Sequence, residues 1–311
     1  MEEVHAALAR IPLFAGVDRA QIRATRLGGL TNRVWRLDFG GRSFCLRIPG
    51  HGTADYIDRR AEETNARAAA RAGVSPEVLY FDPTDGLMLT PFLAGAVTMS
   101  PDLFRRRPGA AARAGAVLRR LHTSGERFAN RFDLFAMIDG YLAALARRNA
   151  ALPEGYREAM RQAEVVREAL AAHPVPWVPC HCDPLCENFL DDGSRMWIVD
   201  WEYAGMNDPM WDLGDLAVEG AFSEALQGEL LVGYFGQPPD PFDRGRMAIF
   251  MAMCDLLWTL WGLIQDADGN PADDFKTYAA NRFARYRQRV ARADFAEHLE
   301  AVRAGPHGGR P

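Results

Sequence analysis

A change in residue pattern between residues 90 and 95 divides this chain into a strand-forming part and a helix-forming part. In the first part, residues 34–39 and 43–48 are largely apolar runs on either side of a Gly-Gly pair. Two such runs around a glycine pair predict a β-hairpin. Folding the chain at that turn places Arg47 roughly opposite Val34.

Further segments surround this hairpin. Residues 1–22 predict a short amphipathic helix that ends at Gly16 and is followed by a linker. Residues 57–72 have helix-forming composition. Residues 78–81 and 87–89 predict a second pair of strands, because the turn between them is rich in Asp, Pro and Gly.

Beyond the change in pattern, apolar residues recur at three- and four-residue spacing, which predicts packed helices. These helices cover residues 110–122, 137–150 and 154–172. Residues 247–264 are apolar except for Asp255 and have almost the length of a membrane span. Because a carboxylate lies near the middle of that segment, we expect a buried helix and no transmembrane segment.

The pattern as a whole predicts an α+β chain of two lobes. A small β-rich N-terminal lobe covers residues 1–92, a larger and mainly helical lobe covers residues 93–304, and residues 305–311 form a disordered tail. A length of 311 residues suits two domains. The content of 48% hydrophobic and 25% charged residues is that of an ordinary globular protein, which excludes a disordered or fibrous chain.

Charge and cysteine content exclude further classes of protein. The 36 basic and 41 acidic residues give a formal net charge of −5, with no basic excess to neutralise phosphates, so no nucleic-acid partner is expected. The five cysteines are too sparse for a disulfide framework, and residues 1–10 contain no apolar run typical of a signal peptide. We therefore expect a cytoplasmic protein with reduced thiols and leave its oligomeric state open.

The densest group of polar residues in an apolar setting lies in the second half of the chain. Residues 189–190 and 197–199 flank an Asp-Asp-Gly-Ser turn, so we expect them to pair as a short hairpin. Asn188 enters the first strand and Asp200 leaves the second, which places both at the open end of the hairpin. Asp183 lies on the loop that approaches the same place.

These three side chains suit phosphoryl transfer. The carboxylate of Asp200 and the amide oxygen of Asn188 are ligands that Mg²⁺ takes together with waters and substrate phosphates. Asp183 is placed to accept a proton from a substrate hydroxyl. A base, then a metal-binding Asn, then a metal-binding Asp after a hairpin is the order found in kinases.

Several blocks of sequence carry a family resemblance. They are Gly28-Gly29-Leu30-Thr31-Asn32, Leu46-Arg47-Ile48-Pro49-Gly50, His181-x-Asp183-x4-Asn188 and Ile198-Val199-Asp200-Trp201-Glu202-Tyr203, which runs on to Pro209. In this order they resemble the choline/ethanolamine kinase branch of the aminoglycoside-phosphotransferase-like kinases, particularly bacterial choline kinases. The resemblance implies a two-lobed protein-kinase-like fold that uses ATP and Mg²⁺ to phosphorylate the hydroxyl of choline or a related amino alcohol.

The resemblance also accounts for the absence of a lysine from the strands that are expected to bind the nucleotide. Lys276 is the single lysine of the chain, whereas typical protein kinases hold the α/β-phosphates with a strand lysine paired to a helix glutamate. Bacterial choline kinases resemble this sequence in placing an arginine there, so Arg47 is the candidate, with either Glu62 or the adjacent Glu63 as its partner. The loop expected to cover the phosphates through backbone N–H groups contributes Gly28, Gly29, Thr31 and Asn32.

The acceptor site implied by the resemblance is an aromatic pocket. A quaternary ammonium group has no N–H to donate, so it is held best by aromatic faces and a carboxylate. Trp258 and Trp261 lie three residues apart on one helix face. The full set of candidates is Trp258, Trp261, Tyr278, Glu219, Glu202 and Tyr203.

Other substrates within the class stay open. Ethanolamine has N–H donors and would favour additional carboxylate or carbonyl acceptors over an aromatic pocket. Thiamine is another candidate, and an aminoglycoside would need a broad acidic groove. A catalytically silent ligand-binding protein on a kinase scaffold is the alternative from another class, and the intact Asp183, Asn188 and Asp200 argue against it.

Two positions near the loop qualify this interpretation. Asp212 resembles a family aspartate that supports the loop, and we expect a structural role for it. Cys182 stands where many relatives carry asparagine, which affects the fine geometry of the loop.

Overall fold

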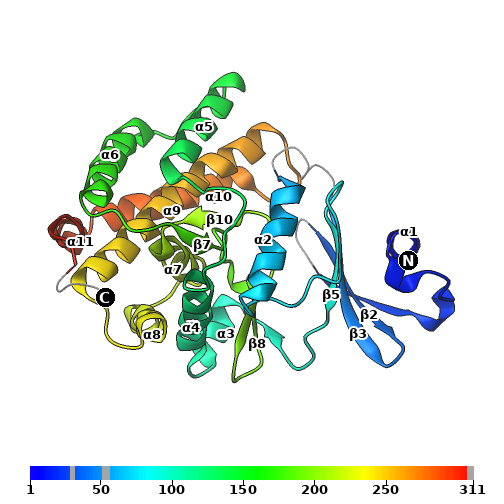
Figure 1. Cartoon of the computed structure of the whole chain (residues 1–311). Coiled ribbons are helices and arrows are strands. Elements are labelled where there is room, and N and C mark those ends of the chain that lie inside the picture. The colour runs from blue at the N-terminus through cyan, green and yellow to red at the C-terminus, as the bar shows by residue number, and fades with distance from the viewer. Residues whose placement is uncertain (29–31, 51–56, 307–311) are drawn as a thin grey trace.

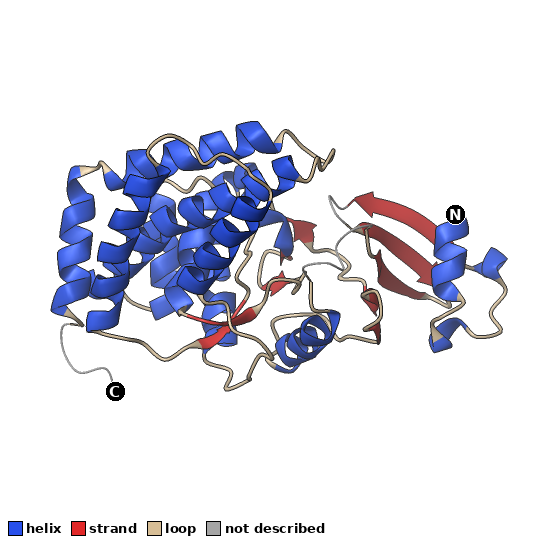
Figure 2. Cartoon of the chain, turned by 90° about the horizontal axis from the view of Figure 1, so that it is seen from above, coloured by secondary structure: helices blue, strands red, loops and turns tan. Residues whose placement is uncertain are grey.

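The computed structural model describes residues 1–28, 32–50 and 57–306. An antiparallel sheet with the N-terminus lies at one end, and a larger body of helices that includes the C-terminus lies at the other (Figure 1). The view from above shows the same two parts, with the longest strands gathered beside the N-terminal helix (Figure 2). The mixed α+β architecture predicted from the sequence is confirmed.

The N-terminal part is a five-stranded sheet in the order β1-β2-β3-β5-β4, in which every neighbouring pair is antiparallel. Its strands are β1 (Arg23–Gly28), β2 (Arg33–Phe39), β3 (Arg42–Ile48), β4 (Tyr80–Asp82) and β5 (Leu87–Pro91). Val34 of β2 lies opposite Arg47 of β3, as the sequence predicts. Leu37, Leu46 and Leu89 are buried in a small core on one face of this sheet.

The N-terminal helix is shorter than predicted. Helix α1 (Glu2–Leu8) ends well before Gly16, and the chain continues through two 3₁₀ turns, η1 (Pro12–Phe14) and η2 (Arg19–Gln21). Pro12 disfavours the helical conformation at the residue before it, so the predicted helix up to Gly16 was wrong.

Helix α2 (Arg59–Arg71) lies between the sheet and the larger part (Figure 1). It begins at Asp58, whose carboxylate accepts hydrogen bonds from the backbone N–H groups of Arg60 and Ala61. It ends just before Gly73, where a φ of +71° favours glycine. The predicted helix over residues 57–72 is confirmed, with small differences at its ends.

The larger part consists mainly of helices. They are α3 (Pro101–Arg106), α4 (Ala110–His122), α5 (Leu134–Arg147), α6 (Tyr156–Ala172), α7 (Pro209–Glu219), α8 (Glu224–Phe235), α9 (Pro241–Ala267), α10 (Phe275–Val290) and α11 (Ala293–Ala304). Helix α4 has the predicted bounds. Helix α5 begins earlier than predicted because Asp133 caps it, accepting hydrogen bonds from Phe135 and Ala136. The expected tail after residue 304 lies mostly outside the described residues.

Helix α9 is long and apolar enough to cross a membrane. However, 78% of its most apolar stretch of 18 residues is buried inside the structure. Its fully buried Asp255 lies within ion-pair distance of Arg282, Arg285 and Arg289 of α10. The helix packs against α7, α10 and α11. It is therefore a core helix of this structure, as the sequence predicts.

Short strands position the polar segment of the larger part. Strand β7 (Val178–Cys180) pairs with β10 (Gly205–Asn207), and β6 (Val97–Thr98) pairs with β8 (Phe189–Asp191). Strand β8 also pairs with β9 (Met196–Ile198), with Leu190 opposite Trp197, so the predicted hairpin is confirmed. The backbone N–H of Ile198 donates to the carbonyl of Val74 at 2.8 Å and joins the hairpin to the segment after α2.

Candidate active site

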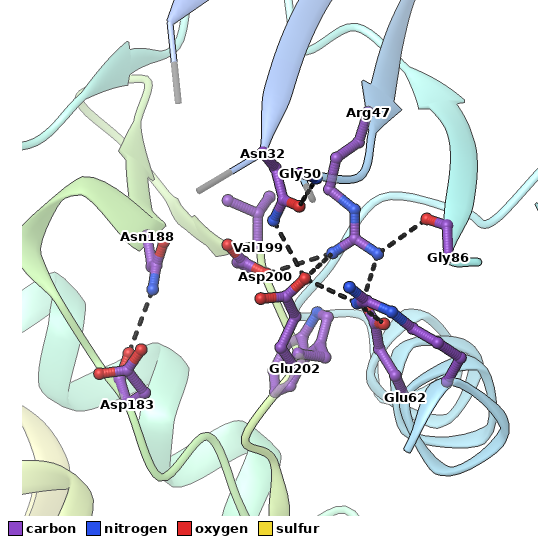
Figure 3. A network of polar contacts seen from close by, with 12 residues as sticks. Asn32, Arg47, Gly50, Glu62, Gly86, Asp183, Asn188, Val199, Asp200 and Glu202 are labelled. Carbon is purple, nitrogen blue, oxygen red and sulfur yellow. Dashed lines mark hydrogen bonds and ion pairs between the residues drawn. The ribbon is translucent and has the colours of Figure 1, made fainter. Parts of the chain in front are cut away.

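The loop between β7 and the 3₁₀ turn η4 (Cys186–Asn188) carries Asp183 and Asn188. The side-chain amide of Asn188 donates from Nδ2 to the backbone carbonyl of Asp183 at 3.1 Å, which holds the two residues next to one another (Figure 3). Because the amide nitrogen is used in this way, the amide oxygen of Asn188 is the atom left for a ligand.

Asp200 follows β9 and comes to the same end of the hairpin. The backbone N–H of Val199 donates to the carbonyl of Asn188 at 3.0 Å, so the predicted convergence of Asn188 and Asp200 is present in the backbone. Asp200 has a φ of +70°, a conformation that few residues other than glycine adopt. Its carboxylate accepts a hydrogen bond from Arg47 at 3.2 Å (Figure 3).

The guanidinium of Arg47 is buried where the sheet meets the larger part. It forms an ion pair with Glu62 of α2 and donates to the carbonyl of Gly86 at 3.1 Å (Figure 3). Glu63 instead pairs with Arg67 of its own helix at 2.9 Å. The structure therefore joins Arg47 to Glu62, one of the two partners that the sequence left open.

Glu202 belongs to this same network. Its Oε1 accepts hydrogen bonds from Arg59 at 2.7 Å and from Asn32 at 3.0 Å, and it lies 3.6 Å from Arg47. Glu202 thus contacts Asn32 and approaches Arg47, which the sequence predicts to bind nucleotide. It does not join the aromatic residues with which it was grouped as a substrate-binding candidate. The sequence analysis missed Arg59, which also pairs with Glu62 at 2.6 Å; its place one helical turn before Glu62 was the available signal.

The glycine loop is described in part. Gly29 and Thr31 lie outside the described residues. Gly28 ends β1 with a φ of +146°, which favours glycine. The amide oxygen of Asn32 accepts a hydrogen bond from the backbone N–H of Gly50 at 3.4 Å, which links the end of the loop to the segment after β3.

The carboxyl groups of this region have shifted pKa values. Burial, together with the nearby charges of Glu219 and Asp200, raises the pKa of Asp183 to about 8. Burial also raises the pKa of Asp200, with Glu202 adding to the rise and Arg47 opposing it. A carboxyl group with a pKa near the working pH is suited to proton transfer.

Asp212 of α7 holds the loop in place. Its fully buried carboxylate accepts hydrogen bonds from the backbone N–H groups of His181 at 2.7 Å and Cys182 at 2.8 Å. The ring Nε2 of His122 lies 3.0 Å from the same carboxylate. Cys182 has a φ of +68°, a backbone conformation that asparagine adopts more readily than cysteine.

The aromatic candidates of the acceptor site form a continuous row. The ring centroids of Trp258 and Trp261 are 6.1 Å apart, and the ring of Tyr278 follows Trp261 at 5.7 Å. The ring of Tyr203 lies 5.8 Å from Trp258 at the other end. Helices α9 and α10 and the segment after β9 therefore bring together four aromatic residues from three separate segments of the chain.

Glu219 lies beside this row at the end of α7. Its carboxylate forms an ion pair with Arg282 of α10, and the guanidinium of Arg282 lies 4.8 Å above the ring of Tyr278. Arg282 also approaches Asp255 of α9 at 3.3 Å. The acidic and aromatic candidates are thus brought together, and one face of Tyr278 is covered by an arginine of the chain itself.

Comparisons with known proteins agree with this geometry. Residues 23–250 match the model of the phosphotransferase enzyme family. The structure of a choline/ethanolamine kinase family protein from Mesorhizobium loti is 56% identical, with a TM-score of 0.90 over 98% of this chain and 99% of that chain. Choline kinase LicA from Streptococcus pneumoniae is 26% identical, with a TM-score of 0.72 over 86% of this chain and 93% of its own. Protein LicA from Haemophilus influenzae is 28% identical over 87% of this chain and 80% of its own.

The likeness spans both parts of the molecule. An aminoglycoside phosphotransferase bound to ADP and hygromycin B shares the fold at 17% identity, with a TM-score of 0.62 over 88% of this chain and 95% of its own. The protein is an ATP-dependent kinase that acts on an alcohol group of a small molecule. The chain belongs to the phosphotransferase enzyme family, in its choline/ethanolamine kinase branch.

Proposed function

We propose that this kinase transfers the γ-phosphoryl group of ATP to the hydroxyl of choline or a closely related amino alcohol. The observation that carries the proposal is the position of Asp183. Its half-buried carboxyl group is affected both by the charge of Asp200, at the proposed nucleotide end, and by that of Glu219, beside the aromatic row. A hydroxyl held at Asp183 would therefore lie between a triphosphate and a cationic head group.

Asp183 acts in this proposal as the general base that orients and deprotonates the hydroxyl. Asn188 and Asp200 would hold Mg²⁺, and an amide oxygen beside a carboxylate suits this ion, which prefers oxygen ligands. The Asp200 side chain stays 35% exposed, so a ligand can reach it. When bound, the ion would neutralise charge on the phosphates.

The sheet would secure the nucleotide. The planar guanidinium of Arg47 can grip a phosphate with two N–H groups and stays charged at every working pH. Glu62 fixes its orientation by the buried ion pair. The loop that would cover the phosphates contributes Gly28, Gly29, Thr31 and Asn32. In this arrangement residues 1–92 act as the nucleotide-binding lobe and residues 93–304 as the catalytic and acceptor-binding lobe.

The aromatic row and Glu219 would hold the head group of the acceptor. Indole and phenol faces attract a quaternary ammonium through their quadrupoles. Trp258, Trp261 and Tyr203 would supply these faces, together with the side of Tyr278 that is turned away from Arg282.

The similar proteins support an amino alcohol as the acceptor. LicA of Streptococcus pneumoniae is a choline kinase. Ethanolamine kinase 2 from Mus musculus is 30% identical, but over 39% of this chain only. Choline is therefore the proposed acceptor and ethanolamine the second candidate. A reaction that consumes ATP also favours the cytoplasm as the site of action.

A panel of acceptors tests the proposal. Choline, ethanolamine, thiamine and an aminoglycoside are each assayed with ATP and Mg²⁺ and compared by kcat/KM. We expect choline to give the highest value. Preference for thiamine or an aminoglycoside would contradict the proposal, and absence of ATP turnover with every acceptor would favour a silent ligand-binding protein.

A variant of the aromatic row supplies the second test. Trp261→Leu should raise KM for choline roughly tenfold or more while leaving KM for ATP within about twofold of the parent value, because one aromatic face is lost. Trp177→Leu is the matched control, since this tryptophan is 38% exposed and its ring is covered by Arg131. Equal KM values for choline in the two variants would contradict the assignment of the row.

A further inference from the structure

A second carboxyl group lies beneath the proposed acceptor pocket, on the same face of α7 as Glu219. Asp215 is four residues before Glu219, and residues at that spacing are neighbours on a helix surface. On the facing helix α9, Cys254 is four residues before Trp258 in the same way. The side-chain ligand atoms of Asp215, Glu219 and Cys254 all lie within 4.8 Å of one another.

One oxygen of Asp215 has no partner. The thiol of Cys254 donates to its Oδ1 at 2.9 Å, whereas its Oδ2 has no hydrogen-bond partner among the described residues. The residue is only 1% exposed, so water does not solvate that atom. A buried, unpartnered carboxylate oxygen is costly, so the group requires a proton or an approaching cation.

The surroundings of Asp215 are predominantly acidic. Burial raises the pKa of Asp215 well above its usual value, and the charges of Glu219 and Asp183 raise it further. Arg282 opposes the rise, but its guanidinium is already paired with Glu219. Two thiols of the described residues also interact with Asp215, those of Cys182 in the loop and Cys254 on α9.

We propose that Asp215 is a specificity-determining residue of the acceptor site, protonated in the free enzyme and deprotonated when a cationic head group enters. The proton leaves Oδ2 for solvent, and the resulting carboxylate adds a second negative charge to that of Glu219. Binding of a cationic acceptor favours loss of the proton, and the cation is then attracted by the Asp215 carboxylate. A neutral alcohol of the same shape leaves Asp215 protonated. Proton release and affinity for the cation are then linked reciprocally.

This inference rests on the proposed function and extends it to the basis of charge selection. Choline and its neutral carbon analogue, 3,3-dimethylbutan-1-ol, have nearly the same shape and differ in the charged atom. Comparing their affinities therefore separates the contribution of the charge of Asp215 from that of packing against the aromatic row. The Asp215→Asn variant keeps the size of the side chain but cannot become a carboxylate.

The experiment measures proton release by titration calorimetry, with choline added to the full chain in two buffers of different ionisation enthalpy. It is run at about pH 9, where Asp183, with a pKa of about 8, is already largely ionised. We expect the parent enzyme to release up to about one proton per choline bound and none with 3,3-dimethylbutan-1-ol. Asp215→Asn should lose this release and bind choline roughly tenfold more weakly, with unchanged affinity for the neutral analogue.

Cys254→Ser is the matched control, because it alters the packing around Asp215 and keeps a donor to Oδ1. It should retain proton release. Equal release in the parent and Asp215→Asn would overturn the proposal, and so would identical losses in Asp215→Asn and Cys254→Ser. If choline binds the parent enzyme without releasing a proton, this inference fails and the proposed function stands; if choline does not bind at all, both fail.

Discussion

The guanidinium of Arg47 lies against the carboxylate of Glu62 in a buried ion pair that joins β3 to α2. The pair places one cation at the junction of the sheet and the larger part. A carbonyl and two further carboxylates surround the same guanidinium, so its orientation is fixed from several directions (Figure 3). A side chain held in this way is preorganised for a phosphate.

Arg47→Lys should therefore impair nucleotide binding. A lysine ammonium is a compact point charge and cannot reproduce the planar set of donors that reaches Glu62, Gly86 and Asp200. We expect KM for ATP to rise roughly tenfold, while KM for choline changes little. Steady-state kinetics with each substrate varied in turn checks this, and an unchanged KM for ATP would contradict the role of Arg47.

The partner of Arg47 can be tested separately. Glu62→Gln removes the nearest of the three carboxylates around Arg47 and leaves those of Asp200 and Glu202. Removing one partner of a buried pair costs about 3–5 kcal/mol. Arg59 loses a partner as well, so the loss in the free energy of unfolding should lie in that range. Glu63→Gln is the control, since Glu63 pairs with the partly exposed Arg67, and it should change stability by less than about 1 kcal/mol. Similar losses in the two variants would contradict the pairing.

The backbone at Cys182 gives a prediction about stability. Its φ of +68° disfavours β-branched residues most strongly, whereas asparagine tolerates this conformation. Cys182→Asn should keep the unfolding free energy within about 1 kcal/mol of the parent value, and Cys182→Val should lower it by more than about 2 kcal/mol. Urea denaturation measures both. A valine variant as stable as the asparagine variant would show that the loop does not require this conformation.

The pH dependence of the reaction follows from the pKa of about 8 at Asp183. The proton-accepting form is the carboxylate, which is present above that pKa and is lost as the pH falls below it. The quaternary ammonium of choline does not titrate, so kcat at saturating choline should rise with pH up to about 8 and then level off. A profile that is flat across this range, measured at saturating ATP, would contradict the assignment.

Much of the fold followed from local sequence patterns. The register of β2 and β3 was predictable because a tight Gly-Gly turn fixes which residues face each other, and Val34 does lie opposite Arg47. The hairpin of β8 and β9 was predictable for the same reason. The predicted helix runs past the end of α1 because an amphipathic pattern does not reveal that Pro12 disfavours the helical conformation at the preceding residue.

The site was predictable where the residues lie close together in the sequence. Asp183, Asn188 and Asp200 come from one loop and one hairpin, so their approach could be anticipated. The link of Glu202 to Arg59 and Asn32 joins segments far apart in the chain, and it depends on how the sheet meets the larger part. The unpartnered oxygen of Asp215 likewise depends on the packing of α7 against α9, which no local pattern reveals.

The most direct test of the central claim is the rate of choline phosphorylation by Asp183→Asn. The amide keeps the shape of the side chain but cannot take the proton of the hydroxyl, so we expect kcat to fall by about 10²–10⁴ with ATP binding intact. Asp192→Asn, in the exposed turn between β8 and β9, is the control and should keep the parent rate. A kcat for Asp183→Asn close to that of the parent enzyme would contradict the account.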